Sequence, residues 1–266
     1  MSDFPVKAVV LDWAGTMVDF GCVAPVQALV EVFGEEDVAL TDPEARADMG
    51  RAKIDHLRAI LAAPAVADRW REAKGAAPND ADVERLYDRL QPAMQTAAAR
   101  AARLIPGAAE TAAELTALGV RIGSGTGYTR EMMGPILSQA AAQGYTPEVV
   151  ICAGESPAGR PAPFMTWQAL IALEAWPASA CIKVDDSVVG IEEGKYAGCW
   201  TVGLAASGNG VGLDLDAFHA LPDAERRERI ARSAAELEAA GADYVIDDIS
   251  QLPAIVREIA HRIAAA

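Results

Sequence analysis

Six short apolar runs recur along the chain, and each has the length of a buried β-strand. The first, residues 6–12, reads Val-Lys-Ala-Val-Val-Leu-Asp and ends in an acid. The others occupy residues 119–124, 148–152, 180–185, 200–204 and 243–247. Continuous apolar runs of this kind are typical of parallel strands that are covered on both faces.

Helical stretches separate most of these runs, at residues 107–118, 130–143 and 165–174. Alternating strands and helices predict the α/β class, with a Rossmann-like, open parallel sheet and helices on both of its faces. In such sheets ligands bind at the carboxyl ends of the strands. Polar residues collect at those ends here, namely Asp12, residues 124–126, Asp185 and Asp186.

One segment breaks the alternation. Between about residues 21 and 100 there is no convincing strand, only helix-forming stretches divided by Pro43, Pro64 and Pro78. We therefore expect a helical cap domain at residues 21–100, inserted into a core domain made of residues 1–20 and 101–266. A glycine-rich stretch, residues 205–214, fits neither the dinucleotide fingerprint nor the P-loop, so we expect a plain surface loop there.

Composition narrows the function classes. The chain has 266 residues, of which 52% are hydrophobic, and a net charge of −15. This charge argues against nucleic-acid binding, which needs basic patches, but it allows a small anionic substrate. No apolar stretch is long enough to span a bilayer, and the first residues lack the features of a signal peptide. The sequence therefore predicts a cytoplasmic protein without a membrane partner, whose four scattered cysteines are reduced thiols.

Four patches of polar residues could carry chemistry. Asp12 ends the first strand and precedes Trp-Ala-Gly-Thr, although a lone aspartate there is more often only a turn cap. Ser124-Gly-Thr126-Gly127 offers hydroxyl and backbone N–H donors for a phosphoryl oxygen, and Arg160 adds a cation before a helix. The adjacent carboxylates of Asp185 and Asp186 suit Mg²⁺, since hard cations prefer oxygen ligands.

In this order the four patches resemble the signature motifs of the haloacid dehalogenase superfamily of phosphotransferases. The resemblance implies that Asp12 attacks phosphorus, that Thr126 and Arg160 hold phosphoryl oxygens, and that Asp186 binds Mg²⁺. By the same resemblance Asp185 binds the metal directly or supports a ligand. Phosphatases of the superfamily usually have a second, proton-donating aspartate two residues after the first, whereas this chain has Ala14. Ala14 can still offer its backbone carbonyl to the metal, because that contact does not depend on the side chain.

The predicted cap contains a lysine that could replace the missing acid. If residues 49–58 form a helix, Met49, Lys53 and His56 share one face, next to an apolar stripe that includes Ile54 and Leu57. A lysine partly desolvated there would have a lowered pKa and could attack a carbonyl. A solvated lysine and a surface histidine are the more common arrangement, but Ala14 favours the reactive one.

Taken together, these motifs resemble the phosphonoacetaldehyde hydrolases over essentially the full length. The motifs are residues 12–16, 21–22, 49–50, 53–56, 126–133 and 157–161. The resemblance implies a homodimer that cleaves a carbon–phosphorus bond to give acetaldehyde and phosphate. It implies a Lys53 imine, with His56 moving protons. It also places Cys22, Met49, Gly127 and Tyr128 at the substrate.

Other readings of the sequence remain open at this stage. A phosphomonoesterase or phosphomutase of the same superfamily would want an acid in place of Ala14. A dehalogenase would not need Arg160 and the Asp185–Asp186 pair, and an inactive binding domain would have no reason to keep these residues together. Some members of the superfamily have a further aspartate where this chain has Gly190, which leaves the full set of metal ligands open.

Overall fold

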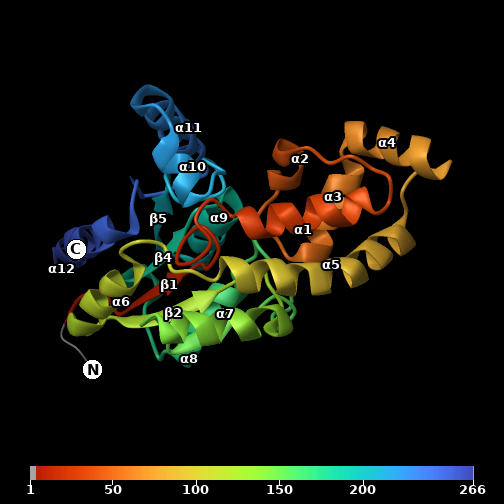
Figure 1. Cartoon of the computed structure of the whole chain (residues 1–266). Helices are drawn as coiled ribbons and strands as arrows, with labels where there is room; N and C mark the ends of the chain where they lie inside the picture. The colour runs from red at the N-terminus through yellow and green to blue at the C-terminus, as the bar shows by residue number, and fades with distance from the viewer. Residues whose placement is uncertain (1–3, 266) are drawn as a thin grey trace.

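The sheet is the centre of the molecule. The structure, a computed structural model, describes residues 4–265. Six strands form one all-parallel sheet in the order β3-β2-β1-β4-β5-β6, of which Figure 1 labels the four central strands. They are β1 Ala8–Leu11, β2 Arg121–Gly125, β3 Val149–Ile151, β4 Cys181–Asp185, β5 Trp200–Leu204 and β6 Tyr244–Ile246. Each lies at one of the predicted runs, and the predicted fold class is confirmed.

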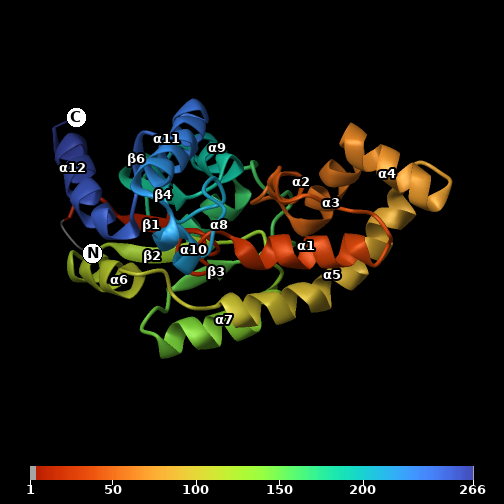
Figure 2. The ribbon, with the colours of Figure 1, turned by 45° about the horizontal axis from the view of Figure 1, so that its top comes forward.

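Helices cover both faces of the sheet, as Figure 2 shows. On β1, Ala8 and Val10 belong to a buried cluster with α8 (Phe164–Ala172) and the end of α9 (Val188–Ala197). Val9 and Leu11 point the other way, into the large core that α6 (Ala108–Ala117) and α12 (Leu252–Ala264) also fill. The remaining helices outside the segment between β1 and β2 are α7 Arg130–Ala142, α10 Leu215–Ala220 and α11 Asp223–Ala239.

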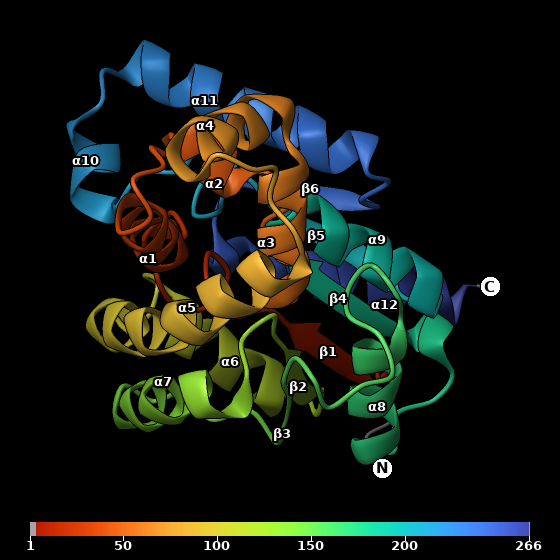
Figure 3. The ribbon, with the colours of Figure 1, turned by 90° about the vertical axis from the view of Figure 1, so that its right-hand side faces the viewer.

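Five helices follow β1 before the chain reaches α6 and β2. They are α1 Val23–Gly34, α2 Asp42–Arg46, α3 Lys53–Ala62, α4 Pro64–Lys74 and α5 Asp80–Ala101. Pro43 and Pro64 lie in the first turns of α2 and α4, where no hydrogen-bonding N–H is required. These helices extend to one side of the sheet (Figure 1), and Figure 3 views the molecule from that side, with α3 in front of the sheet. The division into core and cap domains stays a prediction.

The segment that leads from the sheet into the five helices lies beside the segment that leads back to the sheet. Val18 and Leu104 form an antiparallel bridge. On either side of it, the N–H of Asp19 donates to the carbonyl of Arg103 at 3.3 Å, and the N–H of Ile105 donates to the carbonyl of Met17 at 2.9 Å. The two connections of the helical segment are therefore tied together at one place.

Two local expectations differ from the structure. The helix expected at residues 49–58 begins only at Lys53, because Asp48 and Gly50 have φ values of 59° and 97°, which a helix does not allow. Met49 therefore lies in the turn before α3. The loop of residues 205–214 is not a plain surface loop, since Ser207 and several of its neighbours are buried. Within residues 4–265 no helix combines the length and apolar character needed to cross a membrane.

Candidate active site

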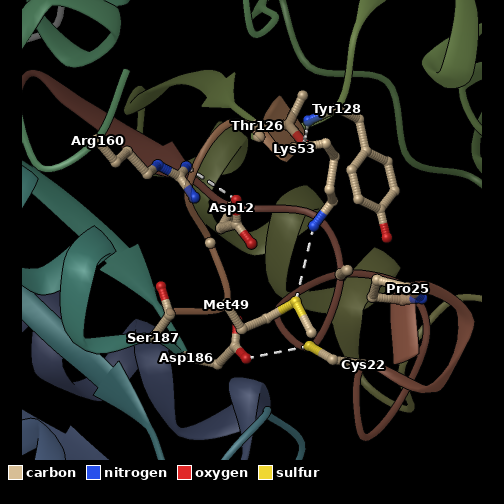
Figure 4. Close-up of a pocket in the computed structure, with 13 residues that line it drawn as sticks. Asp12, Cys22, Pro25, Met49, Lys53, Thr126, Tyr128, Arg160, Asp186 and Ser187 are labelled. Atoms are coloured by element: carbon tan, nitrogen blue, oxygen red, sulfur yellow. Dashed lines mark hydrogen bonds and ion pairs between the residues drawn. The ribbon is translucent and has the colours of Figure 1, made fainter. Parts of the chain in front are cut away.

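A small pocket opens at the carboxyl ends of β1, β2 and β4, and residues of the helical segment line it together with residues of the sheet (Figure 4). Its volume is about 340 Å³, including the part open to solvent. Most of the residues predicted for the site line it: Asp12, Ala14, Cys22, Met49, Lys53, Thr126, Gly127, Tyr128, Arg160 and Asp186. Residues distant in sequence thus meet around a space that fits only a small molecule.

Asp12 stands at the end of β1 beside a buried cation. Its N–H donates to the carbonyl of Val184, which continues the pairing of β1 with β4. Nη2 of Arg160 lies 2.9 Å from Oδ1 of Asp12 and donates to the carbonyl of Gly125 at 2.8 Å. Burial raises the pKa of Asp12, although Arg160 opposes this shift. The carboxylate is thus aimed at the pocket by the strand and partly neutralised by Arg160.

The turn after β2 forms one wall of the pocket. Oγ1 of Thr126 accepts the N–H of Tyr128 at 3.2 Å. A Cβ on Gly127 would lie 2.7 Å from the carbonyl oxygen of Arg51, so only glycine lets the helical segment approach so closely. Tyr128 is buried, its hydroxyl has no hydrogen-bond partner within residues 4–265, and its ring faces Lys53.

Three carboxylates meet beside Asp12. Asp12, Asp185 and Asp186 can each offer one oxygen such that these oxygens lie within 4.8 Å of one another. Oδ1 of Asp186 accepts the hydroxyl of Thr16, while its Oδ2 accepts the N–H of Asn209 at 2.8 Å. Burial, and then repulsion from Asp185 and Asp12, raises the pKa of Asp186 to about 7. A divalent cation would relieve this repulsion, and three clustered carboxylates fit one.

Asp185 is already paired with the ammonium group of Lys183. Burial alone would raise its pKa, but Lys183 at 2.7 Å and Arg160 hold the pKa below its usual value. Its Oδ1 also accepts the N–H and the hydroxyl of Ser187. A Cβ on Gly190 would clash with this carboxylate, so no aspartate fits there. Asp185 therefore suits a supporting role better than direct coordination.

Lys53, the first residue of α3, points into the same pocket (Figure 4). Its side chain is 3% exposed, and Nζ lies 3.7 Å from Sδ of Met49 and 5.3 Å from the centre of the Tyr128 ring. No ion pair of Lys53 is found among the described residues. Burial lowers the pKa of Lys53 to about 8, although Cys22 and Asp12 oppose this shift. An amine with this pKa is neutral in part near pH 7 and can act as a nucleophile.

His56 lies apart from these residues. It is fully buried on α3 and does not line the pocket, and in the part of the chain that the structure describes neither ring nitrogen has a hydrogen bond of good geometry. Burial, and then the charge of Lys53, lowers the pKa of His56 to about 3. The imidazole is therefore neutral near pH 7, so it does not lower the pKa of Lys53 by carrying a charge. The predicted proton transfer by His56 stays a prediction.

Sequence reasoning missed several residues around the site. Pro25, Gly50 and Ser187 also line the pocket. Asn209, in the loop expected at the surface, donates its N–H to Asp186, and a Cβ on Gly208 would clash with that carboxylate. Ser187 carried a usable signal, because a serine directly before an apolar helical stretch is a common N-cap, and Gly50 belongs to one of the motifs that carry the resemblance. The backbone contacts of Gly208 and Asn209 leave no pattern in the sequence.

The class of protein follows from this fold and site. A family model described as haloacid dehalogenase-like hydrolase matches residues 6–198. The chain belongs to the haloacid dehalogenase-like hydrolases and, within them, to the phosphonoacetaldehyde hydrolase family, as its relatives show.

Two curated relatives named phosphonoacetaldehyde hydrolase are similar over nearly the whole chain. The protein from Paraburkholderia xenovorans (strain LB400) is 46% identical over 259 residues, which are 97% of each chain. That from Paraburkholderia phytofirmans is 45% identical with the same coverage. A crystal structure of a phosphonoacetaldehyde hydrolase-like protein from Oleispira antarctica has a TM-score of 0.97 at 41% identity and covers 100% of this chain and 96% of its own. The predicted family and the prediction of an enzyme are confirmed.

Proposed function

We propose that this enzyme hydrolyses the carbon–phosphorus bond of phosphonoacetaldehyde to acetaldehyde and phosphate. The observation that carries the proposal is the meeting of Lys53 with Asp12 in one small pocket, in a chain with Ala14 in place of an acid. The names of the relatives support the substrate. A phosphomonoesterase or phosphomutase would have no use for a buried lysine without a paired carboxylate.

The first half of the reaction concerns the aldehyde. The neutral amine of Lys53 adds to the carbonyl carbon, and loss of water leaves a protonated imine in place of the C=O bond. The depressed pKa of Lys53 provides the neutral amine for the attack. Cys22, Met49, Gly127 and Tyr128 would enclose the two-carbon unit, since all four line the pocket.

The second half transfers the phosphoryl group. A carboxylate oxygen of Asp12 attacks phosphorus, the P–C bond breaks, and its electron pair enters the imine to form an enamine. No proton has to be donated from position 14, because the imine accepts these electrons. Arg160 and Thr126 would hold phosphoryl oxygens. Water then hydrolyses the aspartyl-phosphate, while the enamine takes up a proton at carbon and is hydrolysed to acetaldehyde and free Lys53.

Mg²⁺ is the cation that we propose for the acidic cluster. Asp12 and Asp186 would hold it, with the carbonyl of Ala14 as a further ligand and Asp185 in support. When bound, the ion would offset the negative charges of the phosphoryl group and of Asp12. Oxygen donors alone form the cluster, which suits a hard cation.

The test is chemical trapping of Lys53. Borohydride reduces an imine to a stable amine, so the enzyme treated with phosphonoacetaldehyde and borohydride should carry an adduct on the peptide that contains Lys53. Lys53→Arg should give no adduct, because a guanidinium stays protonated and does not condense. If Lys53→Arg keeps near-normal turnover, or if the adduct maps to another lysine, the imine route is wrong.

We also propose that the enzyme is a homodimer in the cytoplasm. Four exposed large apolar side chains come from α8, the turn after it and the neighbouring α9: Trp167, Ile171, Trp176 and Tyr196. Trp176 is 82% exposed, which is unusual for a monomer and typical of an interface. Sedimentation velocity should show a dimer that Trp176→Glu dissociates, while Val30→Glu, at an exposed position on α1, should not. All four cysteines are unpaired, as a reducing compartment requires.

A further inference from the structure

One buried carboxylate beside the pocket has no part in the reaction outlined above. Glu193 of α9 is fully buried. Its Oε2 accepts a hydrogen bond from Nε of Arg160 at 2.8 Å. Its Oε1 accepts the N–H and the hydroxyl of Thr166 at 3.0 and 2.9 Å. Because both oxygens are bound, the carboxylate has one orientation, and it presents a fixed partner to Arg160.

The remaining donors of Arg160 face the reacting groups. Nη2 donates to the carbonyl of Gly125 and lies 2.9 Å from Asp12, while Nη1 lies 3.5 Å from Asp185. A guanidinium is planar and its donors form a rigid fork. Fixing Nε on Glu193 therefore fixes the edge of the fork that points toward Asp12.

The close approach of α9 to the sheet puts Glu193 at this place. A Cβ on Gly194 would lie 2.7 Å from Cβ of Lys183 and 2.6 Å from Cγ2 of Thr201, so a larger residue would push the helix away. Lys183 lies 3.8 Å from Glu193 and 2.7 Å from Asp185, which gives both carboxylates a second cation. Arg160 is therefore not the only cation that balances the negative charge of Glu193.

We propose that Glu193 is a positioning residue, which holds the guanidinium of Arg160 so that the edge facing Asp12 receives the phosphoryl oxygens. This inference rests on the proposed function in taking a phosphoryl group as the ligand of Arg160. The charge of Glu193 also has an opposing effect on Arg160, which can be tested. An anion 2.8 Å from the guanidinium also weakens the attraction of Arg160 for phosphate, and if that effect dominated, removing the charge would tighten phosphate binding.

The experiment compares Glu193→Gln with Glu192→Gln in the full-length enzyme. Glu192 is the preceding residue on α9, is more exposed, and takes no part in the site, so its variant controls for the loss of one charge from the helix. Calorimetric titration with inorganic phosphate in the presence of Mg²⁺ gives the Kd. For Glu193→Gln we expect the phosphate Kd and the KM for phosphonoacetaldehyde to rise at least about tenfold, which corresponds to about 1.4 kcal/mol. Glu192→Gln should stay within about twofold of the wild type.

Two further measurements separate positioning from a general structural role. Acetaldehyde lacks the phosphoryl group, so borohydride trapping of acetaldehyde on Lys53 should be unchanged in Glu193→Gln. Thr166→Val removes one donor to Glu193 and should raise the phosphate Kd in the same direction by a smaller factor. If the phosphate Kd of Glu193→Gln is unchanged or lower, the inference is wrong. It is also wrong if trapping, melting temperature and phosphate binding fall together.

The phosphate titration also separates this inference from the proposed function. If the wild type does not hydrolyse phosphonoacetaldehyde, the proposed function fails. The ratio of phosphate Kd values between Glu193→Gln and the wild type still decides whether Glu193 positions Arg160.

Discussion

Asp12 and Lys53, the two nucleophiles that we propose, bring a carboxylate and an amine into one small pocket, and each comes from a different part of the chain. Burial acts on both, but with different results. It raises the pKa of Asp12, which Arg160 opposes, whereas it lowers the pKa of Lys53 toward the range in which a free amine exists. The same loss of water therefore favours the reactive form of the lysine and makes the carboxylate depend on its cations.

Asp12→Asn should remove turnover and keep the fold. The amide has the shape of the carboxylate but cannot form the aspartyl-phosphate, so kcat for phosphonoacetaldehyde should fall on the order of a thousandfold or more. The substitution also relieves repulsion with Asp186, so the melting temperature should not fall. Phosphate release and thermal denaturation are the measurements. Activity within about tenfold of the wild type would exclude Asp12 as the nucleophile.

Lys53→Met should stabilise the folded chain at neutral pH. The folded-state pKa of about 8 lies below the ordinary 10.5, so between these values the unfolded chain binds more protons and the wild type becomes more stable as the pH rises. At pH 7 the wild type carries the full cost of the buried charge. Methionine removes this cost, and we expect a gain on the order of 1–3 kcal/mol at pH 7.

The pH dependence provides the control for this substitution. The gain should shrink above pH 8 and be small at pH 10, where Lys53 of the wild type is neutral in the folded chain. Denaturant unfolding of wild type and variant at pH 7 and pH 10 measures it. A variant that is less stable than the wild type at pH 7 would show that Lys53 is not strained by burial.

At the scale of the elements, the contact of α9 with β4 depends on small residues. Gly190 lies against the carboxylate of Asp185, where a Cβ has no room. Gly190→Ala should therefore displace α9 or Asp185 and lower stability by about 1–3 kcal/mol, despite the better helix propensity of alanine. Gly134→Ala is the matched control, since Gly134 also lies inside a helix, α7, but a Cβ there meets nothing within 4 Å. That variant should gain about 0.5–1 kcal/mol. Thermal denaturation of both measures the difference, and equal effects would contradict the packing described.

The elements themselves were predictable because the sheet has a simple pattern. A parallel strand covered on both faces needs a continuous apolar run, and all six runs became strands. The start of α3 was not predictable, because positive φ values at Asp48 and Gly50 interrupt the helical pattern that begins at Met49. Periodicity alone does not reveal such a turn.

The site also contains residues that the sequence reveals and residues that only the structure reveals. Asp12, Lys53, Thr126, Arg160 and Asp186 are visible in the sequence because chemistry demands particular side chains at strand ends and on the helical segment. Asn209 acts through its backbone N–H, which every residue except proline has, so its position leaves no mark. Glu193 was missed because an acidic residue on a helix usually faces solvent, and only the fold shows that it is buried.

For the molecule as a whole, the acidic cluster should link metal binding to stability. A ligand that binds only the folded state stabilises it, by about 2.7 kcal/mol at a hundredfold excess over Kd. Mg²⁺ should therefore raise the melting temperature of the wild type, and EDTA should abolish turnover until Mg²⁺ is restored. Asp186→Asn should lose most of the thermal response, because it removes a charge from the cluster. A metal-free enzyme, verified by elemental analysis, that keeps full activity would contradict the assignment.

The antiparallel bridge between Val18 and Leu104 has a consequence for how such an enzyme can change over evolution. Because the helical segment leaves and rejoins the sheet at one tied place, a different segment could be grafted there without altering the order or register of the strands. Asp12, Thr126, Arg160 and Asp186 would remain, and these are the residues that we propose accept and hold a phosphoryl group. Lys53 would be lost. A chimera that joins a foreign helical segment at residues 18 and 104 should therefore still bind inorganic phosphate with Mg²⁺, yet form no borohydride-trapped adduct with acetaldehyde. The phosphoryl-transfer half and the imine-forming half of the proposed reaction could then be inherited separately, by exchange of the segment at this junction.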